Sequence, residues 1–168
     1  FEEAGVLGPN VIAAHLATVV YEEDLETLAR SGVAAAHCPR SNEYLNCGVS
    51  PVPEMLRRGV RVGMGTDGLW SSPSMNLFEE TLVAVRLHGF EGATGLELAT
   101  LGGSRALGIE AETGSLEAGK WADLAVVDVD PGGEDPACEV IEAAAAGAVL
   151  STVVGGVAVY DSATETAG

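Results

Sequence analysis

The stretch VIAAH at residues 11–15 recurs almost unchanged as VAAAH at residues 33–37. Each copy is a short apolar run that ends in a histidine, and such runs are typical of buried strands. A helical pattern follows each copy, over residues 22–30 and over residues 51–58, and each pattern stops at a glycine. Strands that alternate with helices in this way predict an α/β fold with a parallel sheet.

A third strand and a third helix follow in the same order. The stretch RVGMGTDGLWSS at residues 61–72 begins inside a strand expected over residues 60–64. The next helix is expected over residues 77–87, with Asn76 as its N-cap. Taken alone, an Asp-Gly pair between apolar runs indicates a hairpin turn. Because this pair ends a third strand of the series, Asp67 acquires a second interpretation.

The ends of the three expected strands carry His15, His37 and Asp67. Parallel strands joined by helices end at the same edge of a sheet, so these side chains should project into one region. A single histidine at a strand end is usually a packed residue, but three such groups together favour a functional site. His88 lies outside this pattern and is expected at the surface.

The three side chains also share a chemistry. Two imidazoles and a carboxylate suit a divalent metal such as zinc, whose bound water ionises near neutral pH. The Asp67 carboxylate could hold the metal and accept the proton of the water, while an imidazole orients that water or stabilises charge on the substrate. A doubly wound nucleotide-binding sheet is the weaker interpretation, because HLATVVYEED at residues 15–24 lacks a phosphate-binding glycine pattern.

The sequence changes character after the repeated units. The first part ends in a helix expected over residues 94–107. Strands are then expected over residues 122–129 and on both sides of a hairpin turn at Gly155-Gly156. We therefore divide the chain into a part of strand–helix repeats, residues 1–109, and a smaller β-rich part, residues 110–168.

Composition excludes several classes of partner. The 168-residue chain carries 25 acidic and 8 basic residues, a net charge of −17, which repels the phosphate backbone of nucleic acids. No apolar run approaches the ~20 residues of a membrane-spanning helix, so no membrane partner is expected. The 3 cysteines are odd in number and widely spaced, which favours reduced thiols and a cytoplasmic location.

Several motifs occur in an order and spacing that resemble the C-terminal part of the amidohydrolase superfamily. They are AAH (13–15), HCPRSN (37–42), the stretch from GVSPVPEML to GTDG (48–68), ATLGGSRALG (99–108) and GSLEAGKWADLAVVD (114–128). The resemblance is to the cytosine-deaminase-like and chlorohydrolase-like branch. That branch includes deaminases of S-adenosylhomocysteine, methylthioadenosine and aminofutalosine. The resemblance implies a (β/α)8 barrel, of which strands six to eight are present here, and the C-terminal strands of a flanking β-sandwich.

The resemblance also implies an activity and roles for particular residues. It implies one divalent metal, most often zinc and sometimes iron, and hydrolytic release of ammonia or chloride from a carbon of a heteroaromatic ring. Asp67 stands where the family has its metal-binding and proton-shuttling aspartate. His15 stands where a histidine contacts the reactive water or the substrate, and His37 matches the histidine that closes strand seven. The implied partner is a small molecule resembling a purine nucleoside, and a homo-oligomer is possible at full length.

Parts of the family pattern have no counterpart in this sequence. The HxH pair of strand one, the histidine of strand five and the HxxE glutamate are missing, and the opening FEEAGVLGPN reads like the tail of a helix. We therefore expect a C-terminal fragment that binds zinc weakly and does not turn over adenosine-type substrates by itself. Two alternatives stay open: a dechlorinating or cyclic-amide hydrolase of the same superfamily, and a non-catalytic remnant or assembly module.

Two local features carry further expectations. Trp70, in the segment LWSSPS (69–74), either stacks on a purine ring at the rim or seals its loop against the last helix of the barrel part. Arg40 either pairs with an acidic group of the substrate or, as the favoured interpretation, has a surface or helix-end role.

Overall fold

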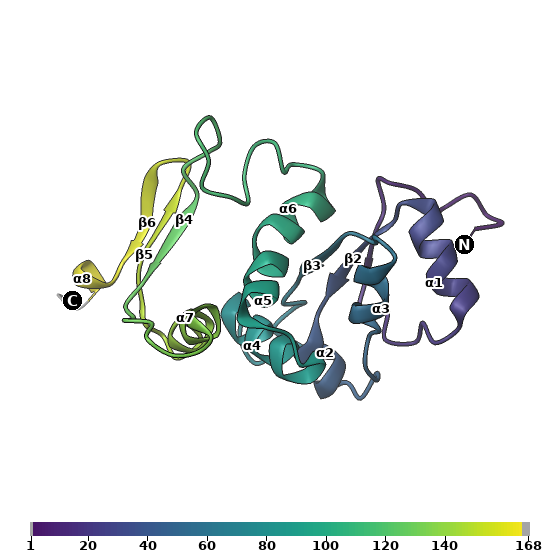
Figure 1. Cartoon of the computed structure of the whole chain (residues 1–168), viewed down its shortest axis with the longest axis horizontal. Helices are drawn as coiled ribbons and strands as arrows, with labels where there is room; N and C mark the ends of the chain where they lie inside the picture. Colours follow the sequence, from purple (N-terminus) through teal and green to yellow (C-terminus); the bar gives the residue numbers. More distant parts are fainter. Residues whose placement is uncertain (1, 166–168) are drawn as a thin grey trace.

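The computed structural model describes residues 2–165 of the chain and contains two three-stranded sheets (Figure 1). The first sheet is parallel, in the order β1-β2-β3, and the second is antiparallel, in the order β4-β5-β6. The strands are β1 (Ile12–Ala14), β2 (Ala34–His37), β3 (Val62–Met64), β4 (Leu124–Val127), β5 (Val149–Val154) and β6 (Val157–Asp161). The predicted α/β class is confirmed. The division into two domains at residue 109 stays a prediction.

Helices connect and cover the strands. They are α1 (Glu22–Ser31), α2 (Pro39–Tyr44), α3 (Val52–Arg57), α4 (Leu77–His88), α5 (Gly92–Ala99), α6 (Leu101–Leu107), α7 (Pro136–Ala145) and α8 (Ser162–Glu165). In Figure 1, α4, α5 and α6 lie between the two sheets, and α1 and α3 lie on the far side of the parallel sheet. Within residues 2–165, none of these helices has the length and apolar character needed to cross a membrane.

Helix termini explain where several of these elements begin and end. The side chain of Asn76 accepts a hydrogen bond from the Phe78 N–H at 3.0 Å, so Asn76 is the N-cap of α4 as predicted. The single helix expected over residues 94–107 is instead two helices, α5 and α6, separated at Thr100. The backbone of Thr100 has φ −122° and ψ −95°, which no helical hydrogen-bond ladder can accommodate.

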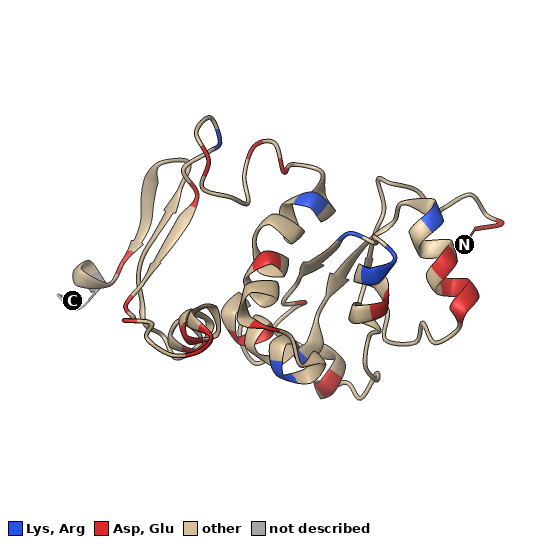
Figure 2. Ribbon diagram, viewed as in Figure 1, with Lys and Arg blue, Asp and Glu red and all other residues tan. Residues whose placement is uncertain are grey.

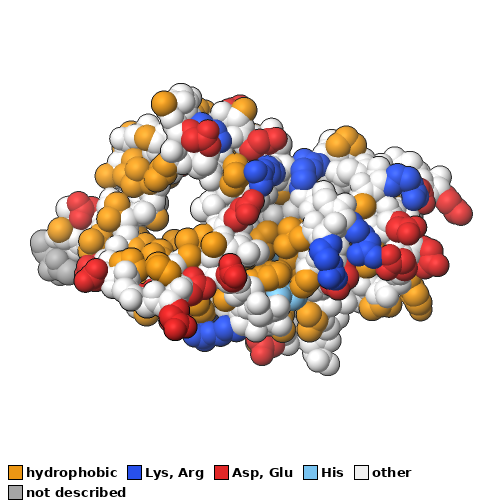
Figure 3. All heavy atoms as spheres, viewed as in Figure 1, with side chains coloured by type: hydrophobic (Ala, Val, Ile, Leu, Met, Phe, Trp, Pro, Cys, Tyr) orange, Lys and Arg blue, Asp and Glu red, His pale blue; other side chains and the backbone are white. Residues whose placement is uncertain are grey.

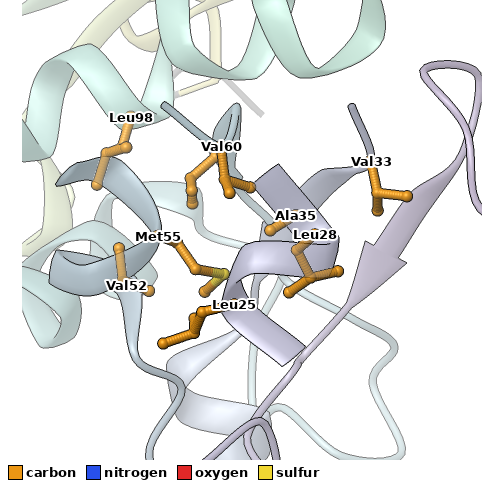
Figure 4. Close-up of a cluster of buried hydrophobic side chains, with 9 residues drawn as sticks. Leu25, Leu28, Val33, Ala35, Val52, Met55, Val60 and Leu98 are labelled. Atoms are coloured by element: carbon orange, nitrogen blue, oxygen red, sulfur yellow. The ribbon is translucent and has the colours of Figure 1, made fainter. Parts of the chain in front are cut away.

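The main hydrophobic core lies between the parallel sheet and the helices packed on it (Figure 4). Leu25 and Leu28 of α1 form the i, i+3 face that the sequence predicts, and Met55 of α3 packs beside them. Ala35 and Val62 supply the strand side of this core. Small residues on β2 leave room for the larger helix side chains, which brings α1 and α3 close to the sheet.

The other helix layer approaches β3 through glycine. A Cβ atom added at Gly63 would lie 2.7 Å from the Cα atom of Gly103, which is closer than real Cβ atoms come to backbone. The glycine pair of ATLGGSRALG therefore allows α6 to contact β3 backbone to backbone. The second glycine pair, Gly155-Gly156, forms the predicted two-residue hairpin turn between β5 and β6, with φ of 57° and 81°.

The two parts of the molecule meet at α7. Ile141 of α7 is fully buried, and its Cδ1 atom would lie 3.2 Å from a Cβ atom at Gly95 of α5. Asp135 accepts hydrogen bonds from the Gly92 N–H at 2.7 Å and from the Cys138 N–H at 2.9 Å, so it ties α5 to the start of α7. A hollow of about 740 Å³ lies between α4–α6 and β4, and Val140 of α7 also lines it (Figure 3).

Candidate functional site

Asp67 lies in the loop that follows β3, and two serines hold its carboxylate. The Oγ of Ser41 donates a hydrogen bond to Asp67 Oδ2 at 2.7 Å, and the Oγ of Ser71 donates to the same oxygen at 2.5 Å. Ser41 belongs to α2, which follows β2, whereas Ser71 is four residues beyond Asp67 in its own loop. Two segments that both follow strands of the parallel sheet therefore fix one carboxylate oxygen.

His15 follows β1 and faces the same carboxylate. Its Nε2 atom lies 3.7 Å from Asp67 Oδ2, and its Nδ1 atom lies 2.9 Å from the Oδ1 atom of Asn42. With the amide oxygen of Asn42 as acceptor, Nδ1 carries the ring proton and donates it. The unprotonated Nε2 then points toward Asp67, and both groups present lone pairs to the same space.

The surroundings of Asp67 favour its ionised form. Hydrogen bonds from Ser71 and then from Ser41, together with the nearby His15 ring, lower the pKa of the Asp67 carboxyl below its ordinary value of 3.8. The side chains of His15 and Asp67 are 34% and 36% exposed, so the pair can be reached from solvent. The pair therefore offers an ionised carboxylate and a ring nitrogen to an incoming ligand.

The backbone at both residues is unusual. His15 has φ 67° and Asp67 has φ 56°, the left-handed region that residues other than glycine seldom adopt. Such conformations are held in place by the surrounding structure and concentrate at functional sites. Two of the three side chains that the sequence places at strand ends are thus held in this backbone conformation, which Leu16 and Asn46 also adopt.

His37 lies away from this pair. Its side chain is only 1% exposed, and its Nε2 atom lies 3.2 Å from the Nε2 atom of His88 on α4. Side chains alternate along a strand, so His37 lies on the same face of β2 as the core residue Ala35. The expected convergence is therefore seen for His15 and Asp67 only. A role of His37 in substrate binding stays a prediction.

The environment of His37 has a clear electrostatic consequence. Burial, and to a smaller extent the neighbouring His88 ring, lower the pKa of His37 from 6.5 to about 3. Within residues 2–165, its buried Nδ1 atom has no hydrogen-bond partner. The expectation that His88 is a surface residue is wrong, because its ring is half-buried between His37 and Phe90.

The structure places Trp70 at the surface and Arg40 in contacts between two helices. The side chain of Trp70 is 97% exposed, so it does not seal its loop against α4, and stacking on a substrate ring stays a prediction. Arg40 has a structural role: its guanidinium contacts Glu79 of α4 and donates a hydrogen bond to Ser74 Oγ at 3.0 Å. Arg40 thus joins α2 to α4.

Sequence reasoning missed the hydrogen-bonding partners of the pair. Ser41 and Asn42 lie within HCPRSN, and Ser71 lies within LWSSPS, but neither stretch shows which side chains they meet. The only available signal was small polar residues directly after strand ends, which is also how ordinary loops read. Within residues 2–165, no group of three or more His, Cys, Asp or Glu side chains is placed to hold a metal ion.

Comparisons with known proteins agree on one family. The model of the amidohydrolase family matches residues 1–159. The 5-methylthioadenosine/S-adenosylhomocysteine deaminase of Syntrophobacter fumaroxidans is 43% identical over 135 residues, which cover 76% of this chain and 31% of that protein. The chain therefore spans about a third of the length of the curated relatives that it matches.

Solved structures give the same result. The zinc-bound adenosine deaminase of Xanthomonas campestris matches with a TM-score of 0.85 and 30% identity, covering 99% of this chain and 42% of that one. An atrazine chlorohydrolase of Arthrobacter aurescens, complexed with zinc, matches with a TM-score of 0.82 and 30% identity, covering 95% of this chain and 38% of that one.

Proposed function

Since the chain belongs to the amidohydrolase family, we propose that it forms part of a metal-dependent hydrolase that deaminates an adenosine-type nucleoside. The observation that carries the proposal is the Asp67 carboxylate, fixed by two serine hydroxyls beside the His15 imidazole. The chain is also 43% identical to a curated relative named for deamination of 5-methylthioadenosine and S-adenosylhomocysteine. The substrate class comes from that relative.

We also propose the place of the chain in the larger fold. In this assignment β1, β2 and β3 are strands six, seven and eight of a (β/α)8 barrel, and residues 1–109 form the barrel part. Residues 110–168, with β4, β5 and β6, then contribute the C-terminal strands of a flanking β-sandwich. The parallel order β1-β2-β3 with helices between the strands supports this assignment. Three strands cannot close a barrel, so the remaining strands would come from outside these residues.

We propose a role for each of the residues that the sequence singles out. We assign Asp67 as a metal ligand and as the group that accepts a proton from the attacking water, because its carboxylate is ionised at neutral pH. His15 orients that water or the substrate through Nε2, since Asn42 engages its Nδ1 atom. Trp70 and His37 are assigned to substrate binding, Trp70 as an exposed aromatic surface at the rim.

The described residues supply only part of a zinc site. A structural or catalytic zinc takes three or four protein ligands, and the pair offers one carboxylate and one imidazole. Residues 2–165 hold no larger group of metal-binding side chains, so these residues do not fit a complete zinc or iron site by themselves. Asp67 is therefore proposed as one ligand of a site that other residues complete.

The proposal has consequences for partners and location. The substrate is a small molecule, and neither nucleic acid nor a membrane is a partner of this strongly acidic chain. We propose a cytoplasmic location, supported by the free cysteines Cys38, Cys47 and Cys138, and homo-oligomer formation at full length.

Expression of the chain together with the coding sequence upstream of Phe1 tests the proposal. The extended protein should release ammonia from methylthioadenosine, S-adenosylhomocysteine or adenosine, and Asp67→Asn should lower kcat by at least about 100-fold. Asp130→Asn, an exposed loop substitution, should leave kcat unchanged. Equal activity of Asp67→Asn and the parent would overturn the assignment of Asp67.

A second candidate is a dechlorinating hydrolase, favoured by the structural match to the zinc-complexed atrazine chlorohydrolase. Chlorotriazines offered to the same extended protein separate the two, because chloride release without ammonia release would favour this candidate. A non-catalytic remnant or assembly module is favoured by the incomplete metal ligand set. Stoichiometric, tightly held zinc on the 168-residue chain alone would argue against it.

A further inference from the structure

Glu80 of α4 is a fully buried carboxylate with two hydrogen bonds to different segments. Its Oε2 atom accepts the backbone N–H of Arg40 at 3.1 Å. Its Oε1 atom accepts the hydroxyl of Ser72 at 3.0 Å. One side chain thus connects the start of α2 to the loop that follows β3.

Each of these contacts lies next to a serine that holds Asp67. Arg40 precedes Ser41 and Ser72 follows Ser71, and the hydroxyls of Ser41 and Ser71 both donate to Asp67 Oδ2. A shift of either segment would therefore move a hydroxyl away from the carboxylate. The geometry makes Glu80 the common anchor of both donors.

The start of α2 depends on this anchor. Within the described residues, the Cys38 side chain at the N-cap position makes no capping hydrogen bond. A carboxylate is favourable at this end of a helix, because it accepts a free N–H and faces the positive end of the helix dipole. Glu80 supplies that cap from another helix, 40 residues away in the sequence.

The burial of Glu80 is costly unless it serves such a purpose. Removal of a carboxylate from water disfavours its charged form, and burial accordingly raises the pKa of Glu80 above its ordinary value of 4.5. A well-packed apolar residue at such a position is often neutral or stabilising, so stability alone gives little reason for a charge there.

We propose that Glu80 is a positioning residue that holds the Ser41 and Ser71 hydroxyls on Asp67. Its importance for catalysis rests on the role proposed for Asp67, but the positioning itself does not depend on activity. A glutamine at this position can keep both contacts, because its amide oxygen accepts the Arg40 N–H and its amide group donates to Ser72 Oγ. An alanine keeps neither.

Solution NMR on the 168-residue chain tests the positioning directly. In Glu80→Ala, the amides of Arg40, Ser71 and Ser72 should exchange with solvent at least about tenfold faster than in the parent. The carboxyl ¹³C shift of Asp67 at pH 7 should move toward its value in Ser71→Ala. Glu80→Gln should restore both readouts.

Two further variants separate positioning from a general loss of stability. Ser72→Ala should accelerate hydrogen exchange at the Ser71 amide while leaving the Arg40 amide protected. This variant removes the Ser72 contact of Glu80 and keeps the Arg40 contact. Glu97→Ala, which removes an exposed carboxylate of α5, should change none of these readouts. The amide of Ala35, which donates to the Arg61 carbonyl in the buried central strand β2, reports on global opening.

Specific exchange results would overturn the role proposed for Glu80. The proposal is overturned if Glu80→Ala leaves exchange at Ser71 and Ser72 within twofold of the parent. It is also overturned if the Ala35 amide accelerates by the same factor, or if Glu80→Gln behaves like Glu80→Ala. Absence of deaminase activity in the extended protein would refute the proposed function and leave these NMR results unaffected.

Discussion

His37 and His88 form a partly buried pair of histidines that carries no net charge. Two neutral imidazoles share a hydrogen bond through their Nε2 atoms, so one ring must donate and the other must accept. Burial lowers the pKa of both rings, which keeps the pair neutral at physiological pH. Protonation of either ring would add a buried charge next to the sheet.

The titration of His37 gives a prediction with a definite sign. Its pKa is about 3 in the folded chain and 6.5 when unperturbed, so between these values the unfolded state binds a proton that the folded state does not. The free energy of unfolding should therefore fall as pH falls from 6.5 toward 3, by up to about 1.4 kcal/mol per pH unit.

Urea unfolding at pH 7 and at pH 5 measures this loss, and His37→Gln should reduce it. Histidine ring NMR signals identify the group, because the His37 signal should keep its neutral shift at pH 5. A His37 signal that titrates near 6.5 would contradict the prediction.

At the scale of elements, the packing of α6 on β3 depends on the absence of side chains. Gly63 and Gly103 bring strand and helix into backbone contact, and neither backbone can move aside locally. This contact places α6 directly behind the strand that leads into Asp67. The loop that holds Asp67 therefore starts from a strand with little freedom to shift.

Gly63→Ala should destabilise the chain. The added methyl group would lie 2.7 Å from Gly103 Cα, and overpacking of this kind costs about 1–3 kcal/mol. Gly132→Ala is the matched control, because a Cβ atom there meets no atom of the described residues within 4 Å. Urea titrations of both variants measure the difference. A Gly63→Ala variant as stable as Gly132→Ala would show that the helix and strand can separate at no cost.

The sequence predicted those elements whose signals are local. The parallel strands, the Asn76 cap and the Gly155-Gly156 turn follow from apolar runs and turn chemistry. The helix α2 could not be predicted, because its six residues are too few to show a period and its cap comes from Glu80. The break at Thr100 was missed because apolar residues continue across it.

In the candidate site, too, only the features with local sequence signals could be predicted. His15 and Asp67 could be paired from their places at strand ends, because parallel strands end at one edge. The side of the sheet that His37 faces depends on the exact register of β2, which a one-residue shift reverses. The partners Ser41 and Ser71 are separated by 30 positions, and only the folded chain brings them to one oxygen.

At the scale of the whole molecule, α7 is the joint between the two sheets. It packs against α4 and α5, and Asp135 ties its start to α5. Figure 2 marks acidic residues along α7 in red, and the buried Ile141 is joined at this contact by an ion pair between Arg86 of α4 and Glu142 of α7 at 2.9 Å. The two sheets should therefore unfold together as long as this contact is intact.

Ile141→Ala should break this coupling. The side chain is 0% exposed, so its truncation should lower the free energy of unfolding by about 2–4 kcal/mol. Leu150→Ala, at a partly exposed position of β5, should cost less. The NMR amide signals of Ala35 in the parallel sheet and Thr152 in the antiparallel sheet should report one urea midpoint in the parent and two in Ile141→Ala. One shared midpoint in the variant would argue against α7 as the joint.

The order β1-β2-β3 leaves β1 at an end of its sheet, and the side chain of its first residue, Ile12, is 44% exposed. A strand in that position is a template for adding further strands, including those of other copies of the chain. The net charge of −17 opposes such contacts through Coulomb repulsion, which acts over ~10 Å in 0.1 M salt and only ~3 Å in 1 M salt. Salt concentration therefore governs the colloidal behaviour of this chain: dilute buffer keeps copies dispersed, and concentrated salt promotes their clustering.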